Sequence, residues 1–269
     1  MGRGSLNDQT TNSQNNQKNM KQLIIRISEQ SMAFATAHYD EADKIEFEPF
    51  HLRNGISAAA NLREAFKSSP LLSRHYDHVE VMVNSPVLLV PLDEFQEEEA
   101  PVLYRHTYLG HDDEDIAHVI IAELYSVAVF ALQKDLKTVV EDHFTDIHYQ
   151  PVSLPVWRHL RIEANNGQRK KLFAYFHDKQ VEMFYSWQNR VKFYNTFQTA
   201  EEYDSLYYLL YVWRQTGLNA ETDELRLVGE IPHEEWLTER LRHFLRNVSV
   251  INPSDNHTKD MPYDMGLME

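Results

Sequence analysis

The sequence predicts a two-lobed α/β protein in which one arrangement of strands and helix occurs twice. Three strand-like segments and a helix occupy residues 22–66, and the same order returns in residues 171–217. A repeated strand–strand–strand–helix unit is a fold-level signal, because each copy can cover one face of its own sheet before the copies pack together. We therefore expect two similar lobes with a cleft between them, where proteins of this kind hold ligands.

Each strand of the repeat is a short run rich in apolar, β-branched or aromatic residues. In the first copy the runs are Leu23–Ser28, Met32–Ala37 and Ile45–Phe50, followed by a helix from Ile56. In the second copy they are Leu172–His177, Val181–Trp187 and Val191–Tyr194, followed by a helix from Ala200.

The second-copy helix has the clearest sequence signals. Thr199 and Glu202 have the spacing of a capping box, and Gly217 stands where a left-handed C-cap belongs. Apolar residues recur between them at helical spacing. Further helices are predicted after Ser153 and Pro232, and further strands are predicted at 225–228 and 248–251.

The first half is longer because residues 86–133 interrupt the repeat. This insertion holds a strand at 86–90, a short helix near 92–99, a strand-like segment at 102–109 and two apolar runs at 116–124 and 125–132. A helix at 135–144 and a strand at 147–152 then complete the lobe. We accordingly divide the chain into a tail (1–19), a first lobe (20–166), a second lobe (167–252) and a C-terminal tail (253–269). Both tails are expected to be disordered, because they offer little apolar surface to bury.

The bulk composition excludes several classes of function. The chain of 269 residues carries a net charge of −15, which disfavours nucleic-acid binding. It contains no cysteine, so a disulfide framework, a thiolate metal site and a thiol nucleophile are excluded. No apolar run is long enough for a spanning helix, and the N-terminus is unlike a signal peptide. We expect a cytoplasmic protein.

The duplicated order resembles the ribonuclease H-like unit of the actin-like ATPase superfamily. The chain is also similar to a family of uncharacterised bacterial proteins assigned that fold. The resemblance covers about residues 20–252, rests on element order, and implies an actin-like fold with an inserted subdomain in the first lobe. In active members of the superfamily, ATP with Mg²⁺ lies in the cleft, and the first hairpin of each lobe carries aspartate and glycine.

The residues at the corresponding turns depart from that pattern. The first turn runs from Ser28 to Ser31 without aspartate or glycine, and Glu29 adds a negative charge. The second turn has Asp178 and Lys179 but again no glycine, and the expected glycine pair is reduced to Gly229. Only glycine lets the main chain approach a phosphate closely, so the sequence predicts that the phosphate site is lost.

Two hypotheses of function follow. The first is a non-catalytic scaffold that binds a protein partner or a second copy of itself, with no cofactor and no catalytic residue. Its candidate contacts are Val119 and Ile121 in the insertion, and Tyr208 and Tyr211 in a region dense in aromatic residues. The alternative is an ATPase or phosphotransferase that binds ATP and Mg²⁺ through an atypical site, formed by Ser28, Ser31, Asp178, Lys179 and Gly229.

Potential metal ligands do not form a recognisable pattern in the sequence. The segment His111–Asp115 with His118 is dense in hard ligands, but it lacks the spacing and glycine of a calcium loop and is typical of a solvated loop. The histidines of the first half, among them His78 and His148, do not complete a zinc motif. No metal site is therefore predicted.

Overall fold

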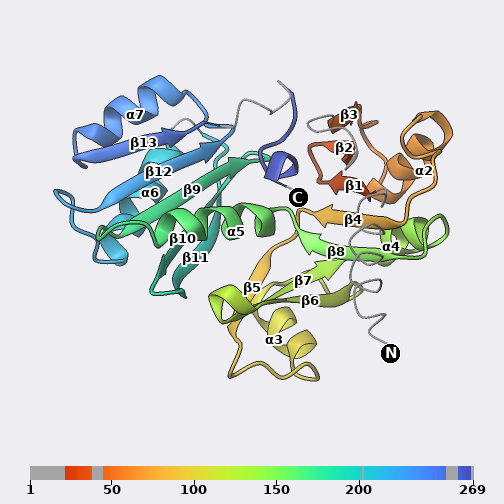
Figure 1. Cartoon of the computed structure of the whole chain (residues 1–269), viewed down its shortest axis with the longest axis horizontal. Helices are drawn as coiled ribbons and strands as arrows, with labels where there is room; N and C mark the ends of the chain where they lie inside the picture. Colours follow the sequence, from red (N-terminus) through yellow and green to blue (C-terminus); the bar gives the residue numbers. More distant parts are fainter. Residues whose placement is uncertain (1–21, 38–44, 202, 253–259, 268–269) are drawn as a thin grey trace, which may run out of the picture.

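The computed structural model describes residues 22–37, 45–201, 203–252 and 260–267. Two five-stranded sheets form the two lobes, and helix α5 (Ser153–Ala164) lies between them (Figure 1). The predicted N-terminal tail, residues 1–19, lies outside the described residues.

The first lobe is built on a sheet with strand order β3-β2-β1-β4-β8. Strands β1 to β3 form an antiparallel meander, and β4 and β8 extend the sheet in parallel. The bounds of its strands and helices are β1 Gln22–Ile27, β2 Met32–Ala37, β3 Ile45–Phe50, α2 Ala58–Ser68, β4 His78–Val83, α4 Lys134–Glu141 and β8 Ile147–Pro151.

The second lobe repeats this topology, with strand order β11-β10-β9-β12-β13. Its meander is again antiparallel and its last two strands are again parallel. The bounds are β9 Lys171–His177, β10 Gln180–Trp187, β11 Arg190–Gln198, α6 Asp204–Gln215, β12 Glu224–Gly229, α7 Glu234–Arg242 and β13 Asn247–Ile251. The two sheets match strand for strand, which confirms the predicted duplication.

The insertion forms its own sheet in strand order β5-β7-β6, below the first lobe in Figure 1. Its elements are β5 Val87–Pro91, α3 Ala100–Thr107, β6 Asp115–Ile121 and β7 Ser126–Leu132. The predictions of a helix near 92–99 and of a strand at 102–109 were wrong, because the helix begins at Ala100. Pro101 suits the first turn of a helix, and the short apolar run around Tyr104 does not distinguish strand from helix by periodicity.

The start of helix α6 also differs from the prediction. The helix begins at Asp204, whose Oδ2 accepts a hydrogen bond from the Glu201 amide at 2.8 Å. The N-cap is Tyr203 rather than Thr199, whose amide donates to the carbonyl of Lys179 at 2.9 Å. The pairing of β10 with β11 holds Thr199 beside the β9–β10 turn, and this tertiary constraint overrides the local capping signal.

The largest apolar core continues from one lobe into the other. It includes Leu23 and Ile25 of β1, Trp157 of α5, and Phe173 and Phe184 of the second sheet. The rings of Trp157 and Phe184 stack with their centroids 6.1 Å apart. Helix α5 therefore joins the lobes by packing as well as by chain connection.

The C-terminal segment corrects the prediction of a disordered tail. Residues 260–267 lie between the lobes (Figure 1), and Met261 and Met265 pack against Ile24 and Met82 on one face of the first sheet. Residues 253–259 lie outside the described part of the chain. In that described part, no helix combines the length and apolar character needed to cross a membrane.

Candidate functional site

The first hairpins of the two lobes meet directly at the cleft. Ser28 Oγ, in the β1–β2 turn, donates to Asp178 Oδ1 in the β9–β10 turn at 2.6 Å. Ser31 Oγ lies 3.3 Å from the same oxygen. The fold thus brings together Ser28, Ser31 and Asp178, three residues that the sequence placed in the alternative phosphate site.

Arg26 lies at the centre of this contact. Its guanidinium is almost fully buried on β1, where Nη2 donates to Asp178 Oδ2 at 2.7 Å and Nη1 donates to Ser31 Oγ at 2.7 Å. Its Nε lies 2.8 and 3.0 Å from the two carboxylate oxygens of Asp264. Burial opposes the charge of Arg26, but Asp264 and Asp178 keep its pKa well above the ordinary value. One arginine therefore links the first lobe, the second lobe and the C-terminal segment.

Asp264 is fully buried in this arrangement. Besides Arg26, its Oδ2 accepts a hydrogen bond from the hydroxyl of Tyr175 on β9, at 2.8 Å. Burial, followed by the charge of Asp264, raises the pKa of Tyr175 well above its ordinary value, so the phenol stays a donor. Each lobe thus contributes a donor to the same carboxylate.

His177 extends the network into the second lobe. Its Nδ1 lies 3.0 Å from Asp178 Oδ2 and its Nε2 lies 2.9 Å from Glu182 Oε1, so both ring nitrogens face carboxylates. Burial lowers the pKa of His177, but the two carboxylates outweigh it and raise the pKa to about 9. Burial likewise opposes the charge of Asp178, but His177 and Arg26 hold the pKa of that carboxyl well below its usual range. At neutral pH the imidazole of His177 therefore carries a positive charge, between the side chains of Asp178 and Glu182.

The main-chain amides of the first turn are already occupied. Ser28 Oγ accepts from the amides of Gln30 at 3.2 Å and Ser31 at 2.9 Å, which are amides that a phosphate-binding turn would direct at its ligand. In the second turn, Asp178 and Lys179 adopt φ angles of +46° and +58°. The Asp178 carboxylate fills the space between the two turns.

Gly229, the remaining candidate of the alternative site, lies at the end of β12 beside β9. Its φ is +87°, and a Cβ at this position would lie 2.3 Å from the carbonyl oxygen of Phe176. That oxygen accepts a hydrogen bond from the Glu230 amide at 2.8 Å. The close approach of two main chains within the sheet accounts for this glycine.

Beside the hairpin contact is a cavity of about 490 Å³, lined by both turns and by the base of the insertion. Lys179 is exposed at this cavity, which also includes Glu29, Asp178 and Glu182 in its lining. Gln180 at its wall donates to Asn84 of the first lobe at 2.9 Å. Of these three carboxylates, Asp178 is paired with Arg26 and Glu182 with His177, whereas Glu29 adds a negative charge beside Lys179.

A family model for DUF3822, a family described as proteins of unknown function, matches residues 8–248. The chain belongs to DUF3822. No curated protein sequence matches it.

Solved structures place this DUF3822 protein in the actin-like ATPase fold. A crystal structure of a Bacteroides thetaiotaomicron protein with an actin-like ATPase fold and unknown function is 25% identical, covers 98% of both chains and gives a TM-score of 0.82. The PilM–PilN type IV pilus biogenesis complex contains a chain that is 14% identical, with coverage of 87% of this chain and 89% of that one and a TM-score of 0.52. The predicted family and fold class are confirmed, including the two similar lobes and the inserted subdomain.

The candidate contact residues of the insertion lie on β6, at one edge of its sheet. Ile121 is fully buried in the main core, so its assignment to an interaction surface was wrong. Val119 is half-buried and packs against the same core. The exposed apolar residue of this strand is Ile120, whose side chain is 53% accessible. We expected Val119 and Ile121 to face outward from β6. The odd-numbered residues of this strand instead face the lobe, and Ile120 faces outward.

The candidate tyrosines of the second lobe lie on α6. Tyr208 is half-buried and stacks on Phe197 at 4.6 Å, whereas Tyr211 is exposed. Tyr203 and Tyr207 are exposed as well, and with Tyr211 they recur every four residues. Together these three tyrosines form an aromatic stripe along one face of the helix.

The acidic segment of the insertion contacts side chains of α3 and α4 as well as its own. His111 Nδ1 contacts Glu114 Oε2, Arg105 donates to the Glu114 carbonyl at 3.0 Å, and Asp115 pairs with Lys137 at 3.0 Å. These contacts attach the polar loop to both helices.

Five residues of the interlobe network were not identified from the sequence: Arg26, Tyr175, His177, Glu182 and Asp264. Arg26 did carry a signal, because a lone arginine inside an apolar strand needs a buried partner. Asp264 carried none, since its surroundings have the composition of a tail.

Proposed function

We propose that this DUF3822 protein is a non-catalytic actin-like scaffold rather than an ATPase. The observation that supports the proposal is the direct link from Arg26 and Ser28 to Asp178 across the cleft. In an actin-like ATPase the two hairpins close on the phosphates of ATP. Here they close on each other, through a carboxylate, a guanidinium and two hydroxyls.

Electrostatics oppose phosphate binding at this position. A phosphate placed between the turns would have to displace Asp178 from Arg26, and it would then lie beside the carboxylate that it had displaced. A like charge about 4 Å away costs roughly 4 kcal/mol at an effective dielectric near 20. That energy corresponds to about three orders of magnitude in affinity.

The scaffold would act by binding a protein partner or another copy of the chain. The shared fold is compatible with this role, since PilM is found in a complex with PilN. The exposed surfaces that suit it are the aromatic stripe of α6 and the edge strand β6. The cytoplasmic location expected from the sequence stays part of this proposal.

Calorimetry with Mg-ATP tests the proposal on the intact chain. At nucleotide concentrations of about 1 mM we expect no saturable heat, and phosphate release equal to the background without protein. Lys179→Ala removes the exposed cation of the cavity, and Lys192→Ala removes an exposed lysine of β11 as a matched control.

Micromolar binding of Mg-ATP that is lost in Lys179→Ala and retained in Lys192→Ala would overturn the scaffold proposal. It would favour the alternative, an ATPase or phosphotransferase with ATP and Mg²⁺ at the atypical site.

A further inference from the structure

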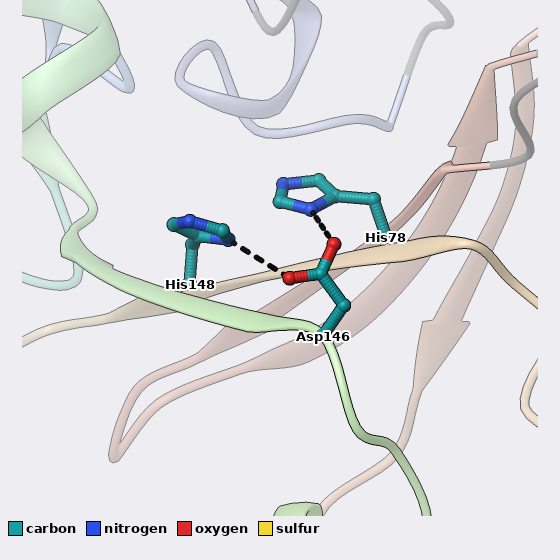
Figure 2. Close-up of side chains that lie close together, drawn as sticks. All are labelled: His78, Asp146 and His148. Atoms are coloured by element: carbon teal, nitrogen blue, oxygen red, sulfur yellow. Dashed lines mark hydrogen bonds and ion pairs between the residues drawn. The ribbon is translucent and has the colours of Figure 1, made fainter. Parts of the chain in front are cut away.

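Three potential metal ligands that are not part of the interlobe network meet at the start of two neighbouring strands. Strands β4 and β8 run parallel, with Glu80 paired to His148, and the Val79 amide donates to the Asp146 carbonyl at 2.9 Å. This register puts His78, Asp146 and His148 on one face of the sheet. Figure 2 shows both imidazoles directed at the carboxylate between them.

Small side-chain rotations would bring the donor atoms to the separations that a small metal ion requires. His78 Nδ1 lies 3.0 Å from Asp146 Oδ2, and His148 Nδ1 lies 4.0 Å from Asp146 Oδ1. One donor atom from each residue can be chosen so that all lie within 4.8 Å of one another. Ligands about 2.0–2.2 Å from a tetrahedral Zn²⁺ lie about 3.3–3.5 Å apart. Small side-chain rotations would therefore close the site, and the exposure of Asp146 and His148, 56% and 62%, leaves room for them.

Glu80 supplies an independent argument for metal binding. Its Oε2 lies 3.4 Å from His78 Nε2, the ring nitrogen that does not face Asp146. A histidine that binds a metal commonly donates its other N–H to a carboxylate, which fixes its tautomer and orientation. A mostly buried carboxylate thus holds the imidazole with Nδ1 toward the cluster.

We propose that His78, Asp146 and His148 bind a divalent first-row transition metal, with Zn²⁺ as the ion that best suits the donor set. Two imidazoles and one carboxylate are a common set for zinc, and the exposed side of the cluster leaves a coordination position for water. The neighbouring Glu80 acts as a positioning residue for His78. This site shares no residue with the interlobe network and does not depend on the scaffold proposal.

A cavity next to the cluster gives solvent and small ligands a path to the metal. It has a volume of about 560 Å³, and its lining includes His78, Glu80, Arg158, Arg161 and Leu267. The C-terminal segment, through Leu267, therefore forms part of the same surface.

Zinc titration of the intact, chelator-treated chain tests the site. We expect one equivalent of Zn²⁺ to bind with micromolar or tighter affinity in calorimetry, and Co²⁺ to give a visible absorption band that Zn²⁺ removes. His148→Ala and Asp146→Asn alter exposed side chains and should fold normally while weakening binding at least tenfold. Glu80→Gln should weaken it about 10–100-fold.

His243→Ala is the matched control, because it removes an exposed histidine from the second lobe. It should bind Zn²⁺ as the unmodified chain does. The proposal is overturned if the intact chain shows no saturable binding below about 1 mM. Equal affinity in the unmodified chain, His148→Ala and Asp146→Asn would overturn it as well, because the ion would then bind elsewhere.

Discussion

Asp264 forms a two-oxygen ion pair with Arg26 across 238 residues of sequence. Both side chains are almost completely removed from water, and Arg26 uses its remaining nitrogens on the two hairpins. The C-terminal segment is therefore part of the cleft, where it neutralises the charge that also holds Asp178. The two lobes are thus joined across the cleft by the protein's own side chains.

Replacing Asp264 by asparagine should strongly destabilise the protein. The variant keeps the shape of the side chain but leaves Arg26 with one fewer counter-charge in a buried position. Breaking a buried pair in this way costs about 3–5 kcal/mol, which urea denaturation would measure as a loss of unfolding free energy.

Asp260→Asn is the control for Asp264, because it changes an exposed aspartate of the same segment. It should alter the unfolding free energy by less than about 0.5 kcal/mol. Equal, small effects of both variants would show that the C-terminal segment is not docked in solution.

Deleting residues 1–19 is predicted to have little effect on stability.

His177 should make stability fall as the solution becomes alkaline. Its pKa is raised from an ordinary value near 6.5 to about 9 in the folded protein. Its contribution is therefore complete below pH 6.5 and is lost as the pH rises through about 9. Compared with His177→Gln, the unmodified chain should lose about 1–3 kcal/mol more unfolding free energy between these limits.

The measurement is a series of urea titrations from pH 6 to pH 9.5. His243→Gln, at an exposed histidine, should follow the unmodified chain throughout. Parallel curves for His177→Gln and the unmodified chain would mean that His177 is not held as a cation in the fold.

Gly229→Ala should be more damaging than the same change at another glycine with positive φ. Gly229 and Gly110 have φ angles of +87° and +89°, but only at Gly229 would the new Cβ meet the Phe176 carbonyl, at 2.3 Å. At Gly110 nothing lies within 4 Å of that Cβ.

Thermal or urea unfolding of the two variants separates backbone strain from steric overlap. Both lose about 1–3 kcal/mol from strain. Gly229→Ala should lose about 1–3 kcal/mol more, because β9 and β12 must move apart. Identical losses would remove the close approach as the reason for this glycine.

If the edge of β6 drives self-association, Ile120→Lys should abolish it. Ile120 is exposed on an edge strand, where another chain can pair, and a lysine there is a natural block to such pairing. Light scattering over a range of concentrations should then show a lower mean mass for the variant.

Leu109→Lys is the control, since Leu109 is 89% accessible in the same insertion but lies outside β6. It should behave as the unmodified chain. Monomers at all concentrations for all three proteins would leave β6 without a role in self-association. Val119→Lys is unsuitable for this test, because Val119 packs against the core.

Much of the fold could be predicted from the sequence, because the strands of both meanders carry local signals. Continuous apolar runs such as Leu23–Ile25 and Leu172–Phe176 indicate buried strands whatever their partners. Their repetition in the same order defined the two lobes and the insertion. The departure of the turns from the superfamily pattern could also be predicted, since the absence of glycine between Ser28 and Ser31 is a property of the sequence alone.

Only the tertiary structure showed how the two hairpins contact each other and where the other candidate site lies. Arg26 and Asp264 are separated by almost the whole chain, and His78 and His148 become neighbours only because β4 and β8 pair in parallel. Residue spacing reports contacts within a helix, a strand or a turn. Contacts between distant segments depend on register and on packing, and those are fixed only when the apolar faces of both lobes and the C-terminal segment are buried together.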